Sequence, residues 1–175
     1  MTENSAEWPS DIFAVLRNRE ISQICHVPDA GHDQLIRQCT AQNDMSVITL
    51  TTEEEGVGVL AGAWLGGRRG ALLMQSSGVG NTVNALSLPA ACRMPFFTIV
   101  TMRGEWGEFI PWQVPMGQAA PSVFDAMNVK VFRADYKEEV GETVDAAGKF
   151  AFNTRQSSAV LLSQKMIGAK QFKEG

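Results

Sequence analysis

The amino-acid sequence predicts an α/β protein of three layers (α/β/α), with helices on both faces of a mostly parallel central sheet. Segments that read as strands alternate with segments that read as helices along the whole chain, and the strands are near-continuous apolar runs. Continuous apolar runs indicate strands covered on both faces, which is typical of parallel sheets with right-handed crossovers. The length of 175 residues fits a single domain over 1–175.

The first half of the chain is predicted to alternate helix and strand, with a turn at 27–31 around Pro28. Ser10 is a possible cap of the first helix. The expected helices cover residues 8–18, 33–42 and 53–65, and the expected strands cover 21–27, 46–51 and 71–75.

The second half begins with a glycine turn over 76–80 that leads into a helix over 81–92. After it we expect a strand at 95–101, a long irregular loop at 103–119, a short helix at 121–127, a strand at 129–133, a helix at 137–152 and a strand at 158–163. Ligands of such a sheet sit at the carboxyl ends of its strands, so the segments after each strand are the ones to inspect.

Composition excludes several classes of function. The net charge is -4, and no basic cluster is longer than Arg68-Arg69, which argues against a nucleic-acid partner. The three cysteines are widely spaced and form no metal-ligand cluster with histidine, so we expect no metal on this chain and a reducing, cytoplasmic location. The first ten residues lack an apolar signal region, and the apolar stretches are too short to span a bilayer.

Three successive carboxylates, residues 53–55, stand at a predicted strand-to-helix junction. One reading is ordinary helix-start charge, with Thr52 as the cap. The glycines that follow, Gly56, Gly58 and Gly62, favour another reading, because each costs a helix roughly 0.8–1 kcal/mol. Small residues let another backbone approach closely, and a carboxylate beside such a contact is partly desolvated, as a proton-relay group is. Local sequence does not separate the three glutamates.

Two further segments offer polar groups to a ligand. Residues 76–82 place hydroxyls and Asn81 after a strand, although Val83 stands where a dinucleotide-binding loop has its third glycine. Arg103 follows the next strand, where it can bind an anion bidentately or form a salt bridge with Glu105 or Glu108. The loop after it is rich in apolar residues, which suggests a lid or a subunit contact.

Taken together, residues 53–64 and 72–81 resemble the pyrimidine-binding domain of thiamine-diphosphate enzymes. More narrowly, they resemble the alpha subunit of sulfopyruvate decarboxylase and the matching half of phosphonopyruvate decarboxylase. The resemblance continues through residues 27–29 and 103–105, and so covers most of the chain. It implies the pyrimidine-binding fold and decarboxylation of a small 2-oxo acid such as 3-sulfopyruvate.

The resemblance also implies roles for single residues. It assigns Glu54 as the catalytic glutamate that hydrogen-bonds a pyrimidine ring nitrogen of thiamine diphosphate, with Glu53 and Glu55 as its neighbours. Ser77, Gly78 and Asn81 fall in the second loop near the cofactor. The residues implied for substrate binding are Asp29, His32 and Arg103.

A Gly-Asp-Gly motif, which in these enzymes belongs to the domain that holds the diphosphate and magnesium, does not occur in the sequence. The resemblance therefore implies a separate beta-type subunit, magnesium held by that partner, and a hetero-oligomer with the cofactor at the interface. Two alternatives stay open. One is phosphonopyruvate decarboxylation, or carboligase or lyase chemistry on a bulkier 2-oxo acid; the other is a scaffold or binding subunit without catalysis.

Overall fold

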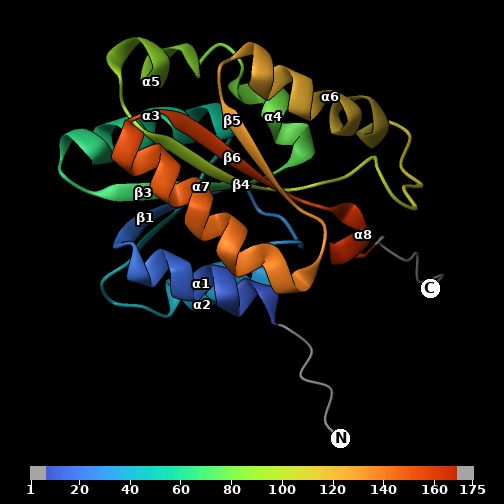
Figure 1. The fold of residues 1–175 in the computed structure, drawn as a ribbon, viewed down its shortest axis with the longest axis horizontal. Helices are drawn as coiled ribbons and strands as arrows, with labels where there is room; N and C mark the ends of the chain where they lie inside the picture. The colour runs from blue at the N-terminus through green and yellow to red at the C-terminus, as the bar shows by residue number, and fades with distance from the viewer. Residues whose placement is uncertain (1–6, 169–175) are drawn as a thin grey trace, which may run out of the picture.

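The computed structural model describes residues 7–168. Its centre is a six-stranded sheet in the order β2-β1-β3-β4-β6-β5, and every neighbouring pair is parallel (Figure 1). This confirms the predicted three-layer α/β class. The strands are β1 (Ile21–His26), β2 (Ser46–Thr49), β3 (Arg69–Gln75), β4 (Phe96–Thr101), β5 (Lys130–Ala134) and β6 (Ser157–Leu162).

Helices connect these strands and lie on both faces of the sheet (Figure 1). They are α1 (Trp8–Asn18), α2 (Asp33–Thr40), α3 (Glu53–Leu65), α4 (Ser76–Thr82), α5 (Ser87–Cys92), α6 (Gln113–Ala126), α7 (Val140–Thr154) and α8 (Gln164–Ile167), with a 3-10 turn at Lys137–Glu139 before α7. Among residues 7–168, no helix combines the length and the apolar character that a membrane span requires.

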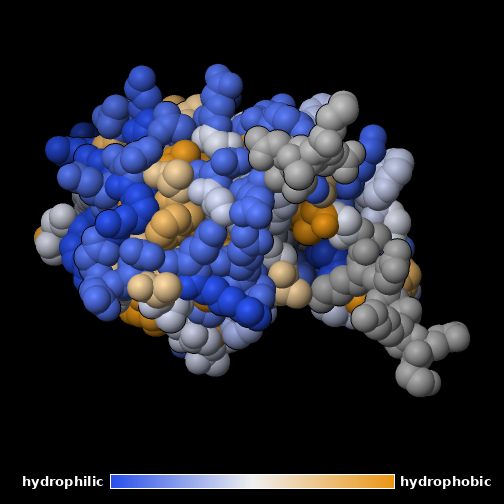
Figure 2. All heavy atoms as spheres, turned by 90° about the horizontal axis from the view of Figure 1, so that it is seen from below, coloured by the Kyte–Doolittle hydropathy of each residue, from blue (hydrophilic) through white to orange (hydrophobic). Residues whose placement is uncertain are grey.

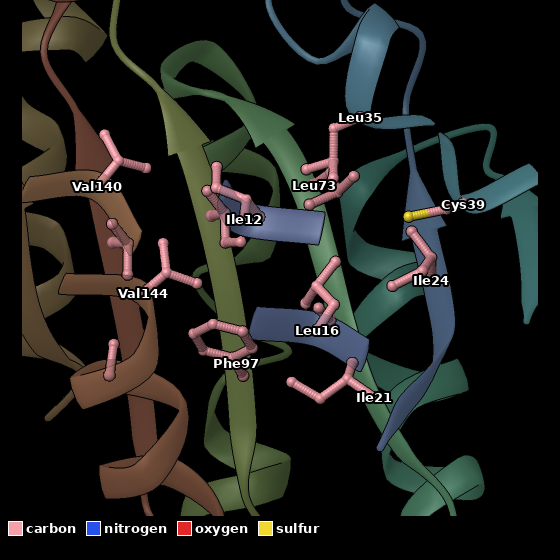
Figure 3. Packing of buried hydrophobic residues seen from close by; sticks show 14 of the residues in the cluster. Ile12, Leu16, Ile21, Ile24, Leu35, Cys39, Leu73, Phe97, Val140 and Val144 are labelled. Carbon is pink, nitrogen blue, oxygen red and sulfur yellow. The ribbon is translucent and has the colours of Figure 1, made fainter. Parts of the chain in front are cut away.

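One core layer lies between the sheet and α1, α2 and α7. Ile12 and Leu16 of α1 reach toward Leu73 and Phe97 on the central strands, and the side chains of α7 close the layer (Figure 3). All four of these side chains are fully buried. Seen from below, from the side of α1 and α2, the face is largely polar with apolar patches between the polar side chains (Figure 2).

A second core layer lies under α3, α4 and α6. Leu72 and Met74 of β3 alternate with the residues that face the first layer, so both faces of the strand are buried. Phe124 of α6 and Val79 of α4 pack onto this side. The continuous apolar strands of the sequence thus have a direct physical cause, because helices cover both sides of each central strand.

Four predicted segments were wrong, those at 76–80, 81–92, 103–119 and 121–127. The tract 76–80 is not a turn but the first part of helix α4, and the helix expected over 81–92 is divided between α4 and α5. The local glycine signal is overridden by packing, because Val79 is fully buried and α4 lies against α6, where Gly80 contacts Met116.

The irregular loop expected at 103–119 is also shorter, because α6 begins at Gln113 and continues through Pro121. A proline inside a helix removes one backbone donor and normally ends the helix. Here Gly117 lets α6 press against the backbone carbonyl of Arg103, and a Cβ at that position would overlap it. Tertiary contact therefore holds a helix that local propensity does not predict. The other elements begin and end within two residues of their predicted bounds, a common uncertainty of helix and strand ends, except that α7 begins three residues late, after the 3-10 turn. Helix α8 was not predicted.

The sheet order places a topological switch beside β1. The chain leaves β1 for the edge strand β2 and then returns to β3 on the other side of β1. Parallel α/β sheets bind ligands in the crevice outside the carboxyl ends of the strands at such a switch. The carboxyl ends of β1 and β3 are therefore the place to look for a site.

Candidate functional site

Three polar side chains stand at the carboxyl edge of the sheet. Asp29 follows β1, Glu53 begins α3 after β2, and Gln75 ends β3. A cavity of about 240 Å³ opens at this edge between the ends of β1, β3 and β4. Its lining is Asp29, Ala30, Gly31, Gln75, Thr101, Met102, Arg103, Ile167 and Gly168.

The three glutamates at the start of α3 have different environments. Glu53 is buried, with 7% of its surface exposed, whereas Glu54 and Glu55 are exposed. Oε2 of Glu55 accepts a hydrogen bond of 2.8 Å from the backbone N–H of Thr51, so this side chain ties down the helix start. Only Glu53 is turned into the protein, although the motif had pointed to Glu54.

Glu53 is held by the helix that follows β3. The side-chain Nδ2 of Asn81 donates a hydrogen bond of 2.8 Å to Oε2 of Glu53. Oε1 lies against Gly78, where an added Cβ would overlap the carboxyl group. Within residues 7–168, Oε1 has no hydrogen-bond partner. The structure thus joins Asn81 and Gly78 of the second loop to a buried carboxylate with one oxygen still available.

Asp29 forms part of the cavity wall, and both of its carboxylate oxygens accept hydrogen bonds. Gln75 donates from Nε2 to Oδ1 at 3.0 Å, and Thr101 donates from Oγ1 to Oδ2 at 2.6 Å. Ser77, expected near the cofactor, donates from its hydroxyl to Oε1 of Gln75 at 3.2 Å. The predicted substrate residue Asp29 and the predicted cofactor residue Ser77 therefore share a partner in Gln75.

Arg103 forms a buried ion pair. Its Nε and one terminal nitrogen each lie 2.7 Å from an oxygen of Glu108, and the two side chains are 8% and 4% exposed. The salt-bridge alternative of the sequence is thus realised with Glu108 and not with Glu105. Gln164 and the backbone N–H groups of Gly104 and Ile110 also donate to this carboxylate. These donors, chiefly Arg103, lower the pKa of Glu108 to about 2.

The Arg103–Glu108 ion pair joins two parts of the loop between β4 and α6. Gln164, the first residue of α8, accepts hydrogen bonds at Oε1 from the backbone N–H groups of Glu105 and Trp106. Trp106 and Trp112 remain 57% and 66% exposed on this loop. The predicted apolar loop is therefore a fixed structure with exposed aromatic rings, anchored by a buried charge pair.

His32 lies in the interior. It is 1% exposed, and its Nε2 lies 3.1 Å from the backbone carbonyl of Ile99 in β4. Burial lowers the pKa of His32 from 6.5, which favours the neutral ring with the proton on Nε2. His26 is also buried, and desolvation lowers its pKa. Nε2 of His26 lies 3.2 Å from Oγ1 of Thr49, so each ring is in contact with one of the strands of the sheet.

Gln75, Gln113 and Gln164 are the site residues that sequence reasoning missed. All three are glutamines near strand or helix ends, and an uncharged glutamine gives no electrostatic signal in the sequence. Gln75 lies within the segment 72–81 but was not singled out there. The available signal was the place of Gln75 at the end of β3 and of Gln164 shortly after β6. In the part of the chain that the structure describes, no group of three or more His, Cys, Asp or Glu side chains could hold a metal ion.

The fold and this edge define the class: an all-parallel α/β protein with a buried, partly satisfied carboxylate at a topological switch point. A search of solved structures agrees on the fold. 2-Oxoglutarate:ferredoxin oxidoreductase from Magnetococcus marinus superposes with a TM-score of 0.71 over 91% of this chain and 29% of its own, at 10% identity. No protein-family model matches the chain.

Sequence relatives identify the family. Sulfopyruvate decarboxylase subunit alpha of Methanococcus maripaludis is 32% identical over 152 residues, covering 86% of this chain and 91% of its own length. The subunit alpha of Methanothermobacter thermautotrophicus is 35% identical over 157 residues, covering 86% and 92%. Phosphonopyruvate decarboxylase of Streptomyces viridochromogenes is 37% identical over 100 residues, covering 57% and 25%. The chain belongs to the family of sulfopyruvate decarboxylase alpha subunits.

Proposed function

We propose that this chain is the alpha subunit of a thiamine-diphosphate-dependent 2-oxo acid decarboxylase, and that Glu53 is its activating carboxylate. The observation that carries the proposal is the buried Glu53 carboxyl group, with one oxygen fixed by Asn81 and the other available beside Gly78. The role of Glu54 stays a prediction of the motif. The geometry favours its neighbour, because Glu54 is exposed.

The residues present fit the pyrimidine end of this cofactor. Oε1 of Glu53 offers an acceptor for a protonated ring nitrogen, while Asn81 keeps the carboxyl group from rotating away. When bound, thiamine diphosphate supplies the electron sink that decarboxylation of a 2-oxo acid requires. Glu53 would hold and move the proton at the ring nitrogen. Ser77, Gly78 and Asn81 would lie against the ring.

The diphosphate and its magnesium belong, in this proposal, to a beta-type partner subunit. The relatives are named as subunit alpha, which implies a second chain. The candidate site is also open at the carboxyl edge of the sheet, where a partner can close it over the cofactor. The enzyme would be a hetero-oligomer of the cytoplasm, whose reducing conditions fit the free thiols of Cys25, Cys39 and Cys92.

The proposed substrate is 3-sulfopyruvate, with phosphonopyruvate as the second candidate because of the partial likeness to phosphonopyruvate decarboxylase. Asp29 at the cavity wall would contact the 2-oxo acid. Substrate binding by His32 and Arg103 stays a prediction. Their contacts favour structural roles, because the Arg103 guanidinium is engaged by Glu108 and the His32 ring is bonded to β4.

The decisive experiment reconstitutes the chain with its beta-type partner, thiamine diphosphate and magnesium, and measures carbon dioxide release from 3-sulfopyruvate and phosphonopyruvate. Glu53→Gln should lower kcat by about 10²–10⁴, the usual contribution of a proton-transfer group, and Glu54→Gln should stay within about twofold of wild type. Binding of thiamine diphosphate to the complex, measured by tryptophan fluorescence, gives a readout independent of turnover. The reverse pattern assigns the role to Glu54, and two fully active variants refute the proposal.

The same assay separates the alternatives. Product analysis with an added aldehyde acceptor distinguishes carboligation from simple decarboxylation. A scaffold subunit would bind the partner equally well with Glu53 or Gln at this position, and it would leave the turnover of the complex unchanged. The buried carboxylate beside Gly78 favours the catalytic reading, because a carboxyl group in that place has a desolvation cost that a pure scaffold does not need.

A further inference from the structure

The side chain of Gln75 joins three separate segments at the carboxyl edge. Gln75 is the last residue of β3 and stands directly before α4. Its amide contacts Asp29 after β1, Ser77 in α4 and Gln113 at the start of α6. The contact with Gln113 is a hydrogen bond of 2.6 Å. No other side chain in the described part of the site links the β1 loop to both helices.

The chemistry of these partners determines which way the amide points. The Asp29 carboxylate accepts, so Nε2 of Gln75 donates to it at 3.0 Å. Oε1 then faces the other way and accepts from Nε2 of Gln113 and from the hydroxyl of Ser77. Gln113 is 2% exposed, which keeps water from replacing its amide in this contact. Hydrogen bonds at Nε2 and at Oε1 therefore both specify the orientation of the Gln75 amide.

We infer that Gln75 is a positioning residue that fixes the Asp29 carboxylate in the cavity wall and ties it to α4, the helix that carries Ser77 and Asn81. The cavity of about 240 Å³ is lined by both Asp29 and Gln75. Thr101 holds the second oxygen of Asp29 at 2.6 Å, so the carboxylate is clamped from two strands. The inference rests on the proposed function in one respect, that Asp29 meets the substrate.

A glutamate cannot replace Gln75 without disturbing the contact with Asp29. A glutamate of the same length would keep an acceptor for Gln113 and Ser77 but place an oxygen against the Asp29 carboxylate. Two carboxylates at that distance repel or must share a proton. Gln75→Glu therefore alters the contact with Asp29 and preserves the contacts with α4 and α6, which makes it a selective probe.

The test uses Gln75→Glu, Asp29→Asn and the double variant, in the reconstituted complex of both subunits. Gln75→Glu should lower the Tm and reduce kcat/KM for the 2-oxo acid by about tenfold or more, chiefly through KM, while the affinity for thiamine diphosphate stays within about twofold. The double variant restores a donor and an acceptor in reversed order, so its Tm should return toward wild type. Its kcat/KM should stay low, because the charge has moved from position 29 to position 75.

Gln118→Glu on the exposed side of α6 is the matched control for the same chemical change, and it should leave both quantities unchanged. A merely structural Gln75 would predict that the double variant recovers kcat/KM together with Tm. That result overturns the inference, as does a Gln75→Glu variant with wild-type Tm and kcat/KM, or a double variant whose Tm shows no recovery.

Failure of the proposed function would give a different set of results from failure of the inference. If the wild-type complex turns over no 2-oxo acid, equilibrium binding of 3-sulfopyruvate to the complex replaces kcat/KM in the same comparison. Binding that weakens about tenfold in Gln75→Glu and does not recover in the double variant supports the positioning role without decarboxylation. A wild-type complex that neither binds nor turns over a 2-oxo acid refutes the proposed function and the substrate part of the inference, and the Tm comparison then decides the Gln75–Asp29 contact alone.

Discussion

Asn81 donates a hydrogen bond from Nδ2 to Oε2 of Glu53 across 2.8 Å, and this contact selects one glutamate out of three. Asn81 lies in α4 and Glu53 in α3, and the two residues follow different strands of the sheet. The hydrogen bond thus couples α4 to the carboxylate proposed to activate the cofactor. It also makes the role of Asn81 testable apart from that of Glu53.

Replacing Asn81 by alanine should reduce activity more than stability. The exposed amide contributes little to the core, but without it the Glu53 carboxyl group is free to rotate. We expect Asn81→Ala to lower kcat by about tenfold, the effect of one lost hydrogen bond to a charged group, with little change in Tm. Asn84→Ala, at another exposed asparagine shortly after α4, is the control. Steady-state kinetics of the reconstituted complex and a thermal melt provide the two measurements, and an unchanged kcat would contradict the role of Asn81.

Gly78 should tolerate no side chain. A Cβ at this position would overlap the carboxyl group of Glu53 and push it from its place, so Gly78→Ala should lower both Tm and activity. The matched variant is Gly58→Ala in α3, where nothing lies within 4 Å of an added Cβ. An alanine there should stabilise the helix by about 0.8–1 kcal/mol. Urea unfolding of the two variants side by side tests the contrast, and equal effects of the two substitutions would refute it.

The Glu108→Gln variant should unfold more easily than a variant with the same substitution at an exposed glutamate. Removing the charge leaves the Arg103 guanidinium buried without its counter-ion, which costs about 3–5 kcal/mol. For a chain of this size that corresponds to a fall in Tm of roughly 6–20 °C. Glu138→Gln, an exposed glutamate, is the control. Limited proteolysis should cut the variant between β4 and α6, and a loop as resistant as that of wild type would argue against the anchoring role of the pair.

The same pair predicts how stability changes with acid. Because the pKa of Glu108 is lowered from 4.5 to about 2 in the folded chain, its contribution is complete above pH 4.5 and is lost as the pH falls toward 2. Urea midpoints measured across this range should fall more steeply for wild type than for Glu108→Gln. Parallel curves for the two proteins would contradict the assignment.

Because His32 is buried, we expect a separate loss of stability at a higher pH than the loss caused by Glu108. The pKa of His32 is lowered by burial, so the unfolded chain binds a proton below pH 6.5 that the folded chain resists. Stability should therefore be complete above pH 6.5 and decrease as the pH falls below it. His32→Gln keeps a donor for the Ile99 carbonyl but does not titrate, and it should flatten the dependence between pH 7.5 and 5.5, apart from the contribution of His26. Urea unfolding at a few pH values provides the measurement.

Much of the fold follows from local sequence because the strands are apolar on both faces. Such runs occur where helices cover both sides of a sheet, so the three-layer class and most element bounds could be read directly. The errors fall where tertiary contacts override local preference. The glycines at 76–80 predicted a turn and Pro121 the start of a helix, yet α4 begins at Ser76 and α6 at Gln113. The two helices pack together, and Gly117 of α6 lies against the backbone carbonyl of Arg103.

The candidate site could likewise be predicted only in part. The motifs located it, because parallel strands bring their carboxyl ends to one edge, and Asp29, Ser77, Gly78 and Asn81 do meet there. The motifs could not show which of the side chains are buried or which hydrogen bonds they form. Three adjacent glutamates look alike in sequence, and a helix turns successive side chains by about 100° each, so only one of them faces the protein.

By itself, then, the sequence determined a three-layer parallel α/β chain and a carboxylate-bearing edge of the sheet, because apolar periodicity and strand-end motifs are local properties. Only the tertiary structure decided that Glu53 is the buried carboxylate, that Arg103 is paired with Glu108, and that Gln75 joins Asp29 to α4. Arg103 and Glu108 lie five residues apart in one loop, and the conformation of that loop pairs them. The other two findings depend on side chains that meet across separate strands and helices. The physical reason is distance along the chain: partners that lie 28 to 46 residues apart, as Asn81 and Gln75 do from theirs, are brought together by folding alone.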